Sequence, residues 1–170
     1  MSLPHFVTEQ WVAAPLSDVF RFFCDPRNLP VLSPPQTVAV LVRASLQPLI
    51  APNGTVQSGL SGAGSEILIS VRILPPLPIR ATWLAKITEV VWEEYFADIQ
   101  VKGPFAAWQH RHEFRGESRN GKVGTVVRDV VEYAAPLGSL GVIADKLFLH
   151  SQIEAMFAHR QRALAQMVWK

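Results

Sequence analysis

The sequence predicts an α+β fold in which a curved antiparallel sheet is covered on one face by a long C-terminal helix. The middle of the chain holds about six segments rich in Val, Ile, Thr and aromatic residues, a composition typical of strands. Short turn signals join these segments, which favours antiparallel neighbours over parallel crossovers. The last segment changes to a helical period, and this helix is the only predicted element able to cover the sheet.

The first predicted elements are one strand and two short helices. Residues 6–12 are expected to form the strand. A helix follows from Pro15, because proline is pre-set for a first helical turn, and it ends at Asp25-Pro26. A second helical turn is expected over residues 28–32, and Pro34-Pro35 stops it.

The strands and the last helix follow from the change of period along the chain. The predicted strands are residues 37–43, 65–74, 79–91, 94–101, 107–115 and 123–134. Residues 57–65 (QSGLSGAGS) are expected to form a flexible loop or an edge segment. One amphipathic helix is predicted from about residue 140 to the C-terminus, with apolar residues near spacings of three, four and seven: Ile143, Leu147, Ile153, Met156, Phe157, Leu164 and Met167.

The bulk properties fit a single domain over residues 1–170. Hydrophobic residues make up 49% of the chain and charged residues 18%, which excludes a disordered protein. The net charge of +2, with no basic run, argues against nucleic acid as a partner. No apolar run is long enough to span a bilayer, and the start MSLPHF has no secretory signal pattern. The single cysteine, Cys24, is expected to be a small buried residue, and a cytoplasmic location is the default.

The stretch GPFAAWQHRHEF, residues 103–114, holds two histidines two positions apart. Asn120-Gly121 is a strong signal for a two-residue hairpin turn, and such a turn would set His112 opposite Asp129. Because side chains alternate along a strand, one face of this hairpin can be listed as Trp108, His110, His112, Phe114, Thr125, Val127, Asp129, Val131 and Tyr133. The opposite face is mostly charged, so both histidines are predicted to point inward beside Asp129.

For the preceding strand, residues 94–101, the sequence does not determine which face is buried. Its composition alone would turn Tyr95 and Ile99 inward. A pairing in register with the hairpin would instead set Asp98 near His110 and Gln100 near Trp108.

The chain resembles the START-like (SRPBCC, helix-grip) superfamily, which includes lipid-transfer domains, plant hydrophobic-ligand binders and aromatic polyketide cyclases. It is similar within that superfamily to a bacterial subfamily of ligand-binding proteins related to polyketide cyclase/dehydrase and lipid-transport proteins. The matching segments are residues 13–35, 96–114, 124–141 and 156–160, while residues 46–62 match poorly. The resemblance implies a seven-stranded antiparallel sheet that grips the C-terminal helix around a hydrophobic cavity. It also implies that Asp98 and Gln100 belong with the histidines.

Four interpretations of the inward histidines remain open. They could form a structural polar network with Asp98 and Asp129, or line a cavity and bind the polar head of a ligand. They could also act in general acid–base catalysis on a carbonyl substrate, with His110, His112 and Asp129 as the catalytic candidates. A His-x-His pair with a nearby Asp has the donor types of a metal site, but it is a weak signal alone, and neither a metal nor another cofactor is predicted.

We therefore expect a protein that binds a small hydrophobic or amphipathic molecule between the sheet and the helix. A cyclase/dehydrase-like enzyme is the alternative, an interaction module with an occluded cavity is a third interpretation, and the sequence leaves a homodimer open. The expected ligand-binding residues are Phe96, Asp98, Gln100, Phe105, Trp108, His110, His112, Asp129, Tyr133 and Phe157.

Overall fold

The strands form one seven-stranded antiparallel sheet in the order β1-β9-β8-β7-β6-β5-β2. The computed structural model describes residues 3–73, 77–135 and 149–169. Within them the sheet strands are β1 (His5–Val12), β2 (Val40–Ser45), β5 (Glu66–Arg72), β6 (Arg80–Val91), β7 (Tyr95–Lys102), β8 (Ala107–Gly116) and β9 (Thr125–Ala134). Strands β5 to β9 follow one another along the sheet, so the predicted antiparallel meander is confirmed.

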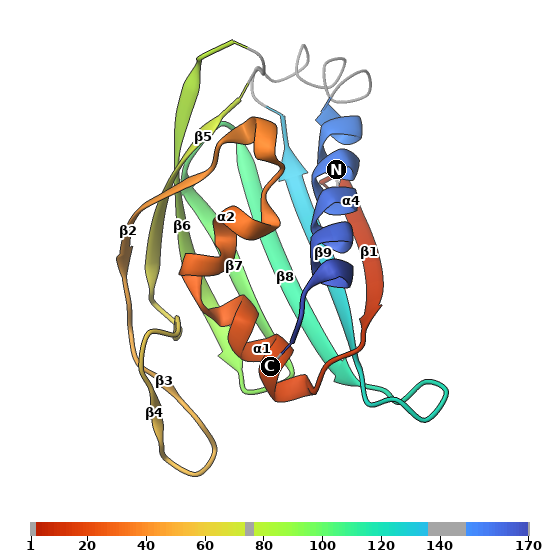
Figure 1. The fold of residues 1–170 in the computed structure, drawn as a ribbon. Helices are drawn as coiled ribbons and strands as arrows, with labels where there is room; N and C mark the ends of the chain where they lie inside the picture. The colour runs from red at the N-terminus through yellow and green to blue at the C-terminus, as the bar shows by residue number, and fades with distance from the viewer. Residues whose placement is uncertain (1–2, 74–76, 136–148, 170) are drawn as a thin grey trace.

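The helices lie together on one face of this sheet, as Figure 1 shows. They are α1 (Leu16–Cys24), α2 (Leu29–Leu32) and α4 (His150–Gln166), with short 3₁₀ turns η1 (Pro26–Asn28) and η2 (Pro35–Thr37). Helix α4 contacts β1 and α2, while α1 contacts β8. The arrangement is the predicted helix-grip fold, with short helices after the first strand and a long helix against the sheet.

Two predicted boundaries differ clearly from the structure. The strand predicted over residues 37–43 starts only at Val40, because η2 occupies Pro35–Thr37 and Val38 has the left-handed φ of 43°. The predicted helix to the C-terminus is wrong beyond Gln166, since Met167 is extended with ψ 139°. Its predicted first part, residues 140–148, lies outside the described residues.

The segment between β2 and β5 forms a small hairpin of β3 (Leu49–Ile50) and β4 (Val56–Gln57), which the sequence does not predict. The loop after it is tied to the body of the fold. Ser61 N donates to the carbonyl of Cys24 at 2.9 Å, and Gly64 N donates to the carbonyl of Ile87 at 2.8 Å. Apart from Gln57, which ends β4, residues 57–65 form the expected loop, and its backbone is anchored to α1 and β6.

The β8–β9 hairpin has the predicted turn and register. Asn120 and Gly121 have φ values of 51° and 74°, which suit a two-residue hairpin turn. His112 is paired with Asp129, and His110 with Val131. The nine residues predicted to face inward on this hairpin are all buried.

The apolar core consists of two clusters that meet along β8. The first contains Phe20 and Phe114, and the second contains Trp108, Tyr133 and Phe157. Because Trp108 and Phe114 frame the two histidines in the sequence, the histidines lie at the junction of the two clusters. Polar side chains thus occupy the middle of an otherwise apolar face.

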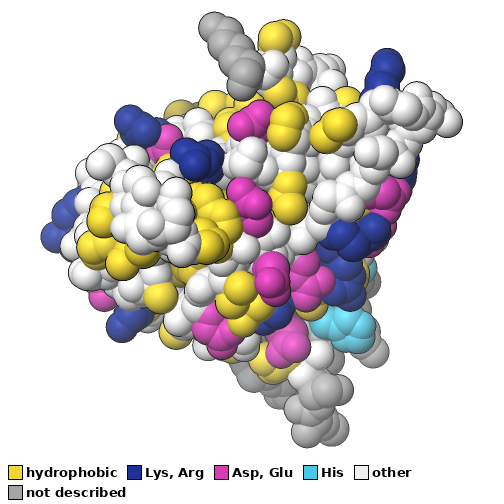
Figure 2. All heavy atoms as spheres, turned by 90° about the horizontal axis from the view of Figure 1, so that it is seen from below, with side chains coloured by type: hydrophobic (Ala, Val, Ile, Leu, Met, Phe, Trp, Pro, Cys, Tyr) yellow, Lys and Arg dark blue, Asp and Glu magenta, His cyan; other side chains and the backbone are white. Residues whose placement is uncertain are grey.

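The surface carries charges of both signs. Figure 2 shows acidic and basic side chains interspersed over the end of the molecule seen from below. On the β8–β9 hairpin, for example, Glu117 contacts both Arg115 and Arg119. This pattern agrees with the low net charge of +2. No helix in the described part of the chain is long and apolar enough to cross a membrane.

Candidate functional site

A cavity of about 760 Å³ lies between the sheet and the helices. Its walls come from the inner faces of β5 to β8, from the α1–α2 segment and from α4. Six of the residues that the sequence predicts for the site line this cavity: Phe96, Asp98, Phe105, Trp108, His110 and His112. Strand β7 therefore turns Asp98 inward, and the register pairs it with His110.

The other four predicted site residues lie outside the lining. Gln100 donates from Nε2 to the carbonyl of Phe105 at 2.8 Å, so it holds the turn that presents Phe105. Tyr133 is fully buried, and its hydroxyl lies 3.1 Å from Nδ1 of His150. Phe157 packs against Phe6 and His110. Asp129 lies behind the two histidines, in a small recess between α4, β1 and β9.

Three side chains meet one oxygen of Asp129. Its Oδ1 lies 2.9 Å from Nε2 of His110 and accepts a hydrogen bond from Nη1 of Arg160 at 3.1 Å. Nδ1 of His112 is 2.8 Å from the same oxygen, but the contact is not directed as a hydrogen bond. All of these side chains are at least 90% buried. A buried carboxylate needs such partners, because an unpaired charge in the interior is costly.

Asp98 has a different environment. Its Oδ2 lies 3.7 Å from Nε2 of His112, too far for a good hydrogen bond. Its side chain is 13% exposed, twice the value for Asp129, and it borders the cavity. The carboxylate of Asp98 thus remains open to a ligand.

Aromatic rings fix the orientation of the histidines. The ring of His112 stacks on Phe96, with centroids 4.3 Å apart, and meets the edge of Phe23. The rings of His110 and His112 lie 3.8 Å apart. Phe157 packs against the other side of the pair through His110 at 5.4 Å. Packing on several sides leaves the imidazoles little freedom to rotate.

The pKa values of the cluster follow from burial and from the shared carboxylate. Burial, helped by His112, lowers the pKa of His110 to about 4, so this imidazole is neutral at neutral pH. Burial also disfavours a charge on His112, but the contacts with Asp129 and Asp98 outweigh it and raise the pKa of His112. Burial would raise the pKa of Asp129, but Arg160 and the two histidines hold it well below its usual range.

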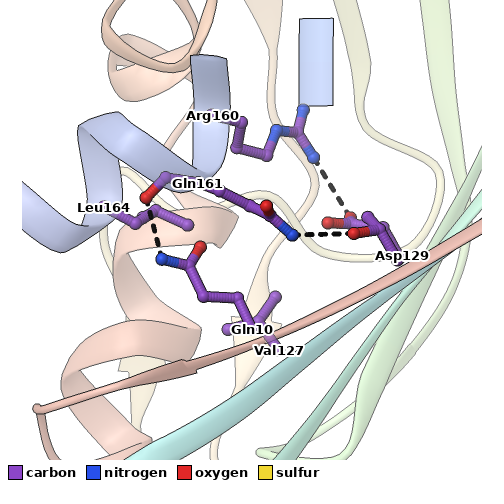
Figure 3. A pocket seen from close by; sticks show the side chains of 7 residues that line it. Gln10, Val127, Asp129, Arg160, Gln161 and Leu164 are labelled. Carbon is purple, nitrogen blue, oxygen red and sulfur yellow. Dashed lines mark hydrogen bonds and ion pairs between the residues drawn. The ribbon is translucent and has the colours of Figure 1, made fainter. Parts of the chain in front are cut away.

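Arg160 is the main residue of the site that the sequence interpretation missed. It lies on the buried side of α4 together with Ile153, Phe157 and Leu164. Figure 3 shows its guanidinium reaching from α4 to Asp129. A signal was present, because position 160 falls in the apolar stripe of the helix and a buried Asp129 requires a cation.

The junction beside this ion pair is closed by amide side chains. Gln10 on β1 donates from Nε2 to the carbonyl of Gln161 at 2.8 Å (Figure 3). Gln161 in turn donates from Nε2 to Oγ1 of Thr8 at 2.7 Å. These bonds fasten α4 to the edge of the sheet on the side away from the cavity. Helix α4 is therefore held in place at the point where Arg160 enters the core.

The cavity wall also contains donor atoms of the kinds that bind metals. Asp98, His110 and His112 each offer one such atom, and the three atoms lie within 4.8 Å of one another. Two imidazoles and a carboxylate are a common donor set for divalent transition metals.

The comparisons with known proteins agree with this architecture. A family model described as "Polyketide cyclase / dehydrase and lipid transport" matches residues 12–162. The comparison with curated proteins finds no match.

Several solved structures share the fold. Ginseng major latex-like protein 151 from Panax ginseng has a TM-score of 0.62 at 10% identity, with 97% of both chains covered. A START superfamily protein from Mycobacterium smegmatis has a TM-score of 0.59 at 11% identity, covering 96% of this chain and 99% of that one. Protein Ms6760 from the same organism has a TM-score of 0.62 at 18% identity, covering 95% and 88%. At such identities the likeness shows the fold alone.

Proposed function

The chain belongs to the polyketide cyclase/dehydrase and lipid transport family, and we propose that it binds a small hydrophobic or amphipathic molecule in its cavity. The observation that carries this proposal is the cavity of about 760 Å³ between the sheet and the helices. Small-molecule sites are concave, have volumes of roughly 300–1,000 Å³ and combine apolar walls with a few polar groups. The cavity has this size and this composition.

The apolar body of the ligand would lie against an aromatic wall. Trp83 meets Phe105 and Trp108 edge to face, at centroid distances of 5.4 and 5.0 Å, and Phe105 and Trp108 pack tilted against each other at 4.7 Å. All three rings line the cavity. Ile153 and Met156 of α4 line it as well. Burial of a ligand against these side chains would contribute roughly 25 cal/mol for each Å² of apolar surface removed from water.

The polar end of the ligand would meet Asp98, His110 and His112. Asp98 lacks a close hydrogen-bond donor among the described residues, and the histidines are oriented by Asp129 and by packed rings. Polar groups fixed in this way bind with little loss of side-chain entropy. A hydroxyl or a protonated amine on the ligand would satisfy the carboxylate of Asp98.

The acid–base alternative receives less support. The contact between His110 and Asp129 has the form of a catalytic pair, because the carboxylate orients the imidazole. Burial, however, lowers the pKa of His110 to about 4, and such an imidazole is a weak base at neutral pH. His112, whose pKa is raised, remains the acid–base candidate, but the cavity favours binding as the proposed function.

A titration with 1-anilinonaphthalene-8-sulfonate, whose fluorescence rises in apolar sites, tests the proposal. Ala85 of β6 lines the cavity, and Ala85→Phe would fill part of it. We expect saturable binding to the wild type, competition by 1,8-dihydroxyanthraquinone, and at least tenfold weaker binding to Ala85→Phe. Thr82→Phe is the matched control, because Thr82 is exposed on the opposite face of the same strand. Absence of saturable binding, or equal binding to wild type and Ala85→Phe, would refute the proposal.

A further inference from the structure

We propose that Asp98, His110 and His112 form a site for one divalent transition-metal ion on the wall of the cavity. The three residues come from neighbouring strands: β7 supplies Asp98 and β8 supplies both histidines. Residues Asp98 and His110 are direct cross-strand partners, and His112 is the next inward residue of β8. The sheet itself thus brings the three donors together.

The distances are close to those of a metal site. Zinc–ligand bonds of about 2.0–2.2 Å place neighbouring donor atoms roughly 3.0–3.5 Å apart in tetrahedral or octahedral geometry. Oδ2 of Asp98 and Nε2 of His112 lie 3.7 Å apart, and all three donors lie within 4.8 Å. Rotation of the Asp98 carboxylate, the most exposed of the three side chains, would therefore bring it closer to the imidazoles.

The outer contacts of the histidines match those of metal ligands. A ligating histidine usually gives its other ring nitrogen to a carboxylate, which fixes the ring and increases its basicity. Asp129 contacts Nε2 of His110 and Nδ1 of His112. These contacts leave the opposite nitrogens, Nδ1 of His110 and Nε2 of His112, for an ion.

Charge balance favours a cation at the same place. Asp129 is neutralised by Arg160, to which it is hydrogen-bonded. Among the described residues the carboxylate of Asp98 has no arginine or lysine partner, and its near neighbours are the imidazoles of His112, at 3.7 Å, and of His110. Metal ligation requires neutral imidazoles. With both histidines neutral, the five-residue cluster of Asp98, His110, His112, Asp129 and Arg160 would carry one net negative charge, which a divalent ion would offset.

An ion at this site would have room for further ligands. All three donors line the cavity of about 760 Å³, so the remaining coordination positions would face the bound organic molecule. The donor set of two imidazoles and one carboxylate suits zinc or ferrous iron. The ion would then hold an oxygen of the ligand's polar end.

Cobalt(II) is the probe for this site, because its visible absorption reports ordered coordination. Untagged full-length protein is stripped with a chelator and titrated with Co²⁺ at neutral pH. We expect one Co²⁺ per chain, and at least tenfold weaker binding for Asp98→Asn and for His112→Gln. Exposed His5 provides the control, and His5→Gln should bind as the wild type does. Competition with Zn²⁺ and with Fe²⁺ under anaerobic conditions then identifies the preferred ion.

Two results would overturn the inference: no saturable Co²⁺ binding to the wild type, or undiminished binding to both Asp98→Asn and His112→Gln. The Asp98→Asn change is isosteric, and circular dichroism of this variant verifies that it folds. The fluorescent-probe titration is repeated on the chelator-treated protein. If the fluorescent probe binds and Co²⁺ does not, the metal site alone is refuted. If Co²⁺ binds and the probe does not, the proposed ligand-binding function alone is refuted.

Discussion

Two carboxylates of the same cluster, Asp129 and Asp98, lie in opposite kinds of environment. Asp129 is enclosed between α4 and the sheet, where Arg160 and two histidines contact one of its oxygens. Asp98 borders the cavity, and its carboxylate lies 3.7 Å from the imidazole of His112, without a close hydrogen bond. The histidines stand between the two carboxylates. This difference indicates that Asp129 closes the fold and orients the histidines, while Asp98 faces whatever enters the cavity.

The largest expected effect is on stability, from Asp129→Asn. Removal of this charge leaves the guanidinium of Arg160 buried without an anion. Loss of one partner of a buried ion pair costs about 3–5 kcal/mol of unfolding free energy. Equilibrium unfolding in urea measures the loss. Asp18→Asn, in the first turn of α1, is the control and should lose no more than about 1 kcal/mol.

If Asp129→Asn were as stable as the control, the assignment of Asp129 to the closure of the fold would be wrong.

A double-mutant cycle of Asp129→Asn and Arg160→Met measures the coupling between these two side chains. The single change Arg160→Met should cost about 2–4 kcal/mol, because Asp129 keeps only the two histidines as partners. The double variant should lose less than the sum of the two single variants, with a coupling energy of at least about 1 kcal/mol. Strict additivity in urea unfolding would show that the two side chains do not depend on each other.

Asp98→Asn is expected to have a small effect on folding. The carboxylate has no close hydrogen bond to lose, so its unfolding free energy should stay within about 1 kcal/mol of the wild type. Urea unfolding beside Asp129→Asn gives the comparison directly. A loss above about 2 kcal/mol would place Asp98 in a structural network and would abolish the contrast between the two carboxylates.

The smallest expected effect is the pH dependence of stability due to Cys24, which lies outside the cluster of Asp98, Asp129, Arg160 and the two histidines. Burial raises the pKa of its thiol to about 12, whereas the thiol of an unfolded cysteine has a pKa of about 8.5. Between these two pKa values the folded protein keeps the thiol proton, whereas the unfolded protein loses it. The contribution of the protonated thiol to the unfolding free energy is therefore complete below the unfolded pKa, and it is lost as the pH rises toward the folded pKa. Iodoacetamide at mildly alkaline pH should label the folded protein at least tenfold more slowly than the protein in urea. Equal rates would contradict the buried position of Cys24.

The sequence predicts the sheet well because the local signals are strong. Asn120-Gly121 determines the register of the β8–β9 hairpin, and this register correctly places His112 opposite Asp129. The orientation of β7 is not determined by composition, since Ala97 and Phe96 are both buried although they lie on opposite faces. Only the family resemblance predicted that Asp98 points inward, and the structure confirms this orientation.

What the sequence did not predict depends on tertiary packing. The hairpin of β3 and β4 consists of two-residue strands, which are too short for an alternating pattern. Gln100, which is predicted to bind the ligand, hydrogen-bonds to the backbone of Phe105, and the sequence does not predict this contact. Arg160 interrupts the apolar stripe of α4, and a charged residue in that position is recognised as buried only when its partner on β9 is known.

Native mass spectrometry of untagged protein incubated with 1,8-dihydroxyanthraquinone tests the central claim most directly, because it counts the molecules that the cavity holds. We expect one bound molecule on the wild type and on Thr82→Phe, and none on Ala85→Phe at the same concentration. Identical spectra for wild type and Ala85→Phe, whether both bare or both loaded, would contradict the claim that the space between the sheet and α4 is a ligand site.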